Sequence, residues 1–117
     1  MIDNTGKMMV YNAAERVSML LGNVSTAQIM SRERTYKVAS ARQLVMWYLY
    51  AVCKMSYSDI GRAMDKNHAT VMYGVRQAEI MINSNRAYDR RIREAAEKLK
   101  SDGLQQDDRQ RTCMGLL

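Results

Sequence analysis

The residues whose types best suit a specific chemical interaction are short side chains that follow a two-residue turn. After Asp65-Lys66 the sequence continues with Asn67, His68, Ala69 and Thr70. Amide, imidazole and hydroxyl groups can hydrogen-bond to the edges of base pairs, and a helix that enters the major groove by its N-terminus needs short side chains there. His68 is the only histidine of the chain, and we expect it to contact DNA. Many helical hairpins begin with Asn or Thr, so an ordinary hairpin is the alternative.

Two helices must position these residues. Residues 56–64 form the first, because Ser56 takes the N-cap place and Asp59 three residues later gives a weakened capping box. Asn67 is a strong N-cap for the second, whose apolar residues recur at steps of four, three and four: Val71, Val75, Ala78 and Ile82. Two helices joined by so short a turn predict a helix-turn-helix. Lys66, in the turn, is included among the expected DNA-binding residues.

A basic segment precedes this pair of helices. Residues 31–37, SRERTYK, are polar and aperiodic, which predicts a loop. Arg32 and Lys37 carry charges that suit phosphate groups. The formal net charge of the chain is +6, and the excess of basic residues begins at Arg32. A polyanionic partner is indicated, with an ordinary basic surface as the alternative.

The segment from Val38 to Lys54 is the most apolar of the chain, with LVMWYLYAVC at its centre. Its β-propensity makes a strand a competing interpretation, but the run is longer than a typical strand and contains no turn residue. We therefore expect a central helix that is buried on nearly every side. Trp47, Tyr48 and Tyr50 are expected in the core, whereas Tyr36 in the basic loop is the aromatic residue considered for contact with nucleic acid.

Two amphipathic helices complete the expected bundle. The first covers residues 7–21, ends at Gly22-Asn23 and is followed by a short turn that Ser25 or Thr26 caps. The last covers residues 88–100, with Arg90, Arg91 and Arg93 on a solvated outer face. Residues 101–117 read as a polar disordered tail. The prediction is an all-α domain of five or six helices over residues 1–100. The apolar stripes of these two helices are Val10, Ala14, Val17 and Leu21, and Tyr88, Ile92, Ala95 or Ala96, and Leu99.

Several separated motifs resemble the C-terminal DNA-binding domain of the bacterial replication initiator DnaA. They are the basic loop from Arg32 to Lys37, Ala41-Arg42-Gln43, Ile60-Gly61-Arg62-Ala63, and Asn67-His68-Ala69-Thr70-Val71. The resemblance covers roughly residues 10–83 and implies a Trp-repressor-like fold that binds double-stranded DNA. It implies that Arg34 reaches the minor groove, that Arg42 and Gln43 contact DNA, and that residues 67–70 read bases.

Three departures from the family pattern bear on the target sequence. The family's motif Asp is Asn67, its first Thr is Ala69, and a second basic residue of its loop is Tyr36. Binding to the DNA backbone should survive these changes, whereas the family's usual target becomes doubtful. The alternative is a fold that has been repurposed to bind protein. The role is expected in replication or in transcription regulation, including that of a mobile element, and these possibilities stay open.

Other function classes find no support in the sequence. No nucleophile–base pair, carboxylate dyad, zinc-type cluster or P-loop is present, so we expect no enzyme, metal, cofactor or nucleotide. Two cysteines do not make a disulfide scaffold. No leader peptide or apolar run of membrane-spanning length is found, so a cytoplasmic protein is expected, with a homodimer as one option.

Overall fold

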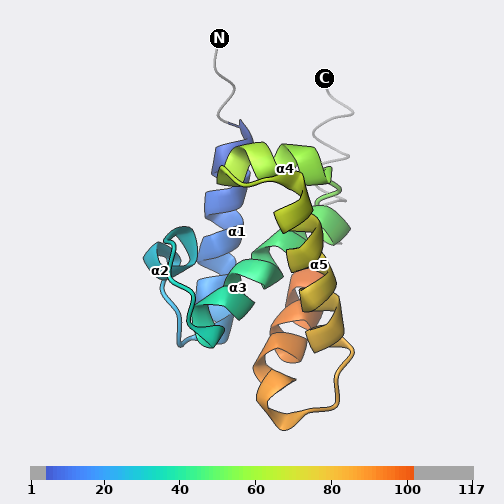
Figure 1. Ribbon diagram of the computed structural model, residues 1–117. Helices are drawn as coiled ribbons and strands as arrows, with labels where there is room; N and C mark the ends of the chain where they lie inside the picture. The colour runs from blue at the N-terminus through green and yellow to red at the C-terminus, as the bar shows by residue number, and fades with distance from the viewer. Residues whose placement is uncertain (1–4, 102–117) are drawn as a thin grey trace.

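The computed structural model describes residues 5–101, which fold as helices joined by short loops (Figure 1). No strand occurs in this range, so the all-α prediction is confirmed and the competing strand after Val38 is rejected. A last helix covers residues 90–101. The elements before it are α1 (Thr5–Leu21), α2 (Thr26–Met30), α3 (Tyr36–Trp47), a π-helical turn η1 (Tyr48–Val52), α4 (Tyr57–Met64), α5 (His68–Ile82) and a 3-10 turn η2 (Ala87–Asp89).

Helix α3 runs through the middle of the bundle, with α1 and α5 packed against it (Figure 1). Its side chains Val38, Ala41, Leu44 and Val45 are fully buried. The predicted stripe of α1 and the apolar residues of the last helix are buried as well. Gly22, which ends α1, has a φ of 75°, a conformation that glycine adopts without steric cost. The hydrophobic periodicity therefore identified these core faces, with one error. Tyr88 was predicted on the apolar stripe of a helix over residues 88–100, but it lies in η2, before the helix begins at residue 90, and is 61% exposed.

Both ends of α3 differ from the expectation. The helix begins at Tyr36, two residues early, so Lys37 lies in its first turn and not in a loop. At the other end the chain widens into the π-helical turn η1, where the Cys53 N–H donates to the Tyr48 carbonyl at 3.1 Å. Trp47 and Tyr48 are buried as predicted. Tyr50 is wrong as a core residue, because it lies within the π turn, where its ring is partly exposed and stacks on Tyr57.

The turn between α4 and α5 depends on a close approach of backbone to backbone. Ser56 caps α4 by accepting a hydrogen bond from the Asp59 N–H at 3.0 Å. Asp65 ends α4 in the left-handed conformation, with φ 58°, and the Lys66 N–H donates to the Gly61 carbonyl at 2.7 Å. A Cβ at Gly61 would lie 2.6 Å from the Lys66 carbonyl oxygen. The short turn therefore requires glycine at this position.

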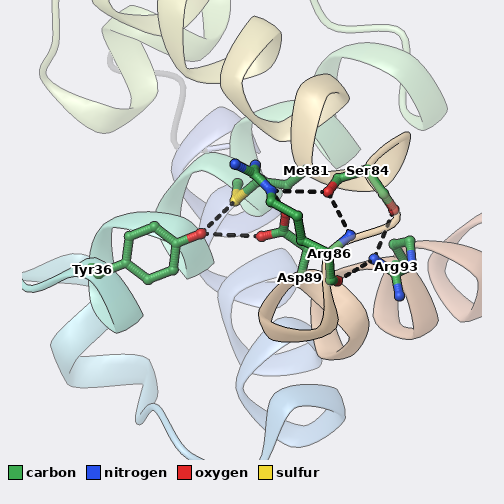
Figure 2. A network of polar contacts seen from close by, with 6 residues as sticks. All are labelled: Tyr36, Met81, Ser84, Arg86, Asp89 and Arg93. Atoms are coloured by element: carbon green, nitrogen blue, oxygen red, sulfur yellow. Dashed lines mark hydrogen bonds and ion pairs between the residues drawn. The ribbon is translucent and has the colours of Figure 1, made fainter.

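A buried carboxylate ties the C-terminal segment to α3 (Figure 2). Asp89 is fully buried and accepts hydrogen bonds from the Tyr36 hydroxyl at 3.1 Å and from Arg86 Nε at 3.0 Å. Arg93 donates to the carbonyls of Ser84 and Arg86. We name the set Tyr36, Ser84, Arg86 and Asp89 the Asp89 network. It explains why α3 starts early: the tertiary contact of Tyr36 favours a helical first turn.

The Asp89 network also fixes the protonation of its members. Burial alone would raise the pKa of Asp89, but hydrogen bonds from Ser84, Tyr36 and Arg86 lower it below its usual value. Burial and the hydrogen bond to Asp89 raise the pKa of Tyr36. The carboxylate therefore stays ionised at neutral pH, and the tyrosine keeps the proton that it donates.

The expected solvated face of the last helix is only partly correct. Arg91 donates to the Leu21 carbonyl at 2.9 Å, and Arg93 is half-buried with two carbonyl acceptors. Arg90 points outward and pairs with Glu94. The predicted tail begins at the last described residue, and residues 102–117 lie outside the described range. Among the helices that the structure describes, none combines the length and apolar character needed to cross a membrane.

Replacing Gly61 with alanine tests the turn. In Gly61→Ala the new methyl group meets a backbone carbonyl that cannot move without opening the turn, so we expect a loss of about 1–3 kcal/mol in the free energy of unfolding. Urea denaturation measures this loss. The matched control is Gly6→Ala, whose Cβ would make an ordinary 3.4 Å contact with Ala63. Equal stability of the two variants would contradict the close approach.

Candidate nucleic-acid interface

The opening of α5 presents the residues that the sequence singled out. Asn67 is the N-cap, and its side-chain oxygen accepts a hydrogen bond from the Ala69 N–H at 2.8 Å. His68, Ala69 and Thr70 are exposed, whereas Val71 is fully buried. Three consecutive helical residues therefore face solvent before the core stripe begins. Short exposed side chains at a helix N-terminus are what a recognition helix needs.

The basic loop and the helix-turn-helix turn lie side by side. Residues of both segments line one pocket of about 170 Å³: Ile29, Met30, Ser31, Arg32, Arg42, Met64, Asp65 and Lys66. Arg32 and Lys66, 34 positions apart in the sequence, thus belong to one surface next to the start of α5. Arg34 is exposed in the same loop. The fold therefore brings two exposed or half-buried cationic side chains of the predicted set, Arg32 and Lys66, to one surface beside the start of α5.

Arg42 requires a correction. It was expected to contact DNA, but only 9% of the residue is exposed, and its guanidinium donates to backbone carbonyls of α2 and of the loop that follows it. Burial lowers the pKa of Arg42, against the opposing charge of Glu33. A planar group with several fixed donors suits such a set of acceptors. The acceptors are Ile29 at 2.8 Å, Glu33 at 3.0 Å, Gln28 at 3.1 Å and Ser31 at 2.6 Å.

We therefore assign Arg42 a positioning role. The guanidinium holds the loop between α2 and α3 in one shape, which places Arg32 beside the turn. Its charge is directed at carbonyl oxygens and not at solvent. The sequence alone did not predict this positioning role, because residue type does not distinguish a buried arginine from a phosphate-binding arginine in a basic segment.

The remaining predicted residues are divided between two places. Gln43 is half-buried beside α5, where a Cβ at Gly74 would lie 3.6 Å from its Cγ, one helical turn beyond Thr70. Lys37 instead lines a groove with Tyr36, Tyr88 and Arg91, at the other end of α3. The structure thus keeps Gln43 close to the opening of α5 and separates Lys37 from it.

Two exposed residues of α5 were missed by the sequence reasoning. Tyr73 is 61% exposed, and Arg76 is exposed as well. They follow Ala69 by four and seven positions, which places them on the same helix face. Continuing the exposed face from Ala69 at this spacing would have found them. Within residues 5–101, no three His, Cys, Asp or Glu side chains are grouped as a metal site would require.

Replacing Arg42 with lysine tests the positioning role. Arg42→Lys keeps the charge, but a single ammonium group cannot bind all four carbonyl oxygens at once. Some of these carbonyls would therefore be left without a hydrogen-bond donor. We expect a loss of roughly 1–3 kcal/mol in the free energy of unfolding and faster tryptic cleavage after Arg32 and Arg34. Thermal melts and limited proteolysis measure the two effects. Arg62→Lys, at an exposed arginine of α4 that pairs with Asp59, is the control, and similar behaviour of both variants would contradict the assignment.

Known proteins share both the sequence pattern and the fold. The family model described as the bacterial dnaA protein helix-turn-helix matches residues 19–78. Chromosomal replication initiator proteins DnaA from Xanthobacter autotrophicus and Corynebacterium jeikeium are 35% identical over 66 residues and 28% identical over 80 residues, or 56% and 68% of this chain. The chain spans only 13% and 14% of their lengths.

The fold agrees with that match. A crystal structure of a DNA replication initiation factor superposes with a TM-score of 0.67 at 22% identity, over 86% of this chain and 30% of the other. The matched residues 19–78 include the basic loop, the turn and the opening of α5. With half of its residues covered by the family model, the chain belongs to the family of bacterial DnaA helix-turn-helix domains.

Proposed function

We propose that this protein binds double-stranded DNA by inserting the N-terminus of α5 into the major groove. The observation that carries the proposal is the exposed opening of α5, residues 67–70, flanked by Arg32 and Lys66 on one surface. The positive end of the helix dipole lies at the same place and favours a polyanion. Membership of the DnaA helix-turn-helix family supports the same ligand.

We assign the side chains of this interface to two tasks, binding the DNA backbone and reading the bases. Arg32 and Lys66 supply charge for phosphates, and Arg34 reaches the minor groove, as the family resemblance implies. His68 and Thr70 read base edges from the first turn of α5, where the Ala69 methyl group leaves room for close approach. Tyr73 and Arg76 extend the contact along the same face of α5. Arg42 acts only through the shape of the loop.

The biological role that we propose is a DNA-binding module for replication or for transcription control. The relatives are named as chromosomal replication initiators, and this chain matches only a small part of them. We propose no catalytic activity for the chain itself, and a site of action in the compartment that holds the DNA.

A protein-binding role is the second candidate. The exposed Tyr73 and Ile80 on the outer face of α5 favour it, since large apolar side chains on one helix face suit a protein partner. The two candidates differ in their dependence on salt, because only DNA binding releases condensed counterions in proportion to the phosphates contacted.

Salt titration of duplex binding tests the proposal. Arg32 and Lys66 at phosphates, Arg34 in the minor groove and Arg76 along α5 place four cationic side chains against the DNA. If they release about four counterions, the log–log slope should be near −3.6, a loss of roughly a hundredfold from 50 to 200 mM salt. Fluorescence anisotropy with a duplex selected from a random library measures the slope. Selection should also enrich a common motif if residues 67–70 read bases. A flat slope, or no retained duplex at low salt, would favour the protein-binding alternative.

Asn67 allows a sharper test of base reading. Its oxygen is engaged by the Ala69 N–H, so mainly the amino group is free to donate, which suits acceptors such as the purine N7. Asn67→Asp keeps the cap but offers only acceptors, which suit the amino group of cytosine. We expect cytosine to be enriched at one position of the selected sites for the variant and a purine for the wild type. If the wild type and Asn67→Asp select the same base distributions, Asn67 is only a helix cap and does not read a base.

A further inference from the structure

Two exposed tyrosine rings lie together away from the opening of α5. Tyr36 begins α3 and Tyr88 lies in η2, and they are 59% and 61% exposed. Their centroids are 6.0 Å apart and their planes meet at 69°, an edge-to-face pair. A groove of about 220 Å³ runs beside them, lined also by Lys37, Arg91 and the apolar side chains of Leu21 and Ile92. The rings thus border a recess that is partly apolar and partly cationic.

The rings are held by polar contacts rather than by burial. The Tyr36 hydroxyl donates to Asp89, and Asp89 accepts from Arg86 (Figure 2). The Arg86 guanidinium lies 4.8 Å from the centroid of the Tyr88 ring. The Asp89 network therefore orients both rings while more than half of each residue stays open to solvent. A contact that served only to tie η2 to α3 would not need exposed aromatic faces.

The surroundings of the rings carry an excess of positive charge. Lys37, Arg86 and Arg91 lie at the rings or in their groove. A second groove of about 380 Å³ shares Leu21 and Arg91 with the first and adds Arg90, Glu94 and Lys98. The lining of the two grooves thus holds four bases against the single acid Glu94, while Arg86 beside them is paired with Asp89. This charge balance complements a polyanion.

We propose that this surface binds single-stranded DNA, with bases stacked on Tyr36 and Tyr88 and phosphates at Lys37 and Arg91. Exposed aromatic rings next to a cationic groove suit unpaired bases, whose faces are free to stack. A duplex buries those faces and presents its phosphates outward, so the rings would add nothing to duplex binding there.

The surface is separate from the proposed duplex interface. The Tyr36 hydroxyl lies 3.8 Å from the Met81 sulfur, near the C-terminal end of α5. His68 is 13 residues earlier in the same helix, which corresponds to about 20 Å along its axis. Substitutions at the opening of α5 and at Tyr88 therefore lie in different parts of the fold and test the two ligands separately.

Binding of a labelled oligothymidylate of about twelve nucleotides tests the proposal. Fluorescence anisotropy at low salt should show binding to the wild-type protein, and Tyr88→Ala should weaken it about tenfold through lost stacking. Tyr88→Phe keeps the ring and should bind as the wild type does. Tyr11→Ala removes a tyrosine that is 51% exposed on α1 and is the matched control. Circular dichroism melts verify that Tyr88→Ala remains folded.

A second variant separates the two DNA surfaces. Thr70→Ala should weaken duplex binding and leave oligothymidylate binding unchanged, and Tyr88→Ala should do the reverse. The proposal is wrong if the wild type does not bind oligothymidylate, or if Tyr88→Ala binds it as tightly as the wild type. It is also wrong if Thr70→Ala lowers binding to both ligands equally, because the strand would then occupy the opening of α5. Failure of duplex binding alone would not affect it.

Discussion

The packing of α5 on α3 is the contact on which the rest of this structure depends. At Gly74 the two helices come so close that a Cβ there would collide with the Met46 sulfur. Val71 and Val75 on α5 are almost completely buried, and each contributes about 1.5–3 kcal/mol by leaving water. This contact orients the exposed face of α5 outward and determines how far its opening projects. The same approach brings Gln43 of α3, a predicted DNA contact, next to α5.

A buried cation shapes the other half of the proposed duplex interface. The Arg42 guanidinium is removed from water and donates hydrogen bonds to four carbonyl oxygens. These bonds compensate part of the free-energy cost of burying its charge. The loop that carries Arg32 and Arg34 has no regular secondary structure of its own. Its shape comes from the hydrogen bonds of Arg42 together with those of the Ser31 hydroxyl with Gln28 and Glu33. Charge in this segment therefore has two functions: one arginine builds the loop, and the others are presented by it.

A second polar assembly, the Asp89 network, performs a comparable task at the first residue of α3, Tyr36. It uses a buried carboxylate where the loop uses a buried guanidinium, and it attaches the last helix to the bundle through Tyr36 and Arg86. Both assemblies satisfy buried charges with several hydrogen bonds, as an apolar environment requires. Both also leave cationic side chains exposed beside them. Residues that hold the fold together and residues proposed to bind ligands therefore lie close together in the sequence.

The sequence by itself determined those features that depend on neighbours along the chain. The stripe from Val10 to Leu21, the caps Ser56 and Asn67, and the exposed opening of α5 follow from helical periodicity and local hydrogen bonding, and the structure agrees with each. The DnaA resemblance likewise rested on local motifs. Tertiary structure alone decided where Arg42, Tyr36 and Tyr50 point, because their partners come from other segments. A polar or aromatic side chain makes its contact with whichever segment packs beside it, and hydrophobic periodicity does not encode that segment.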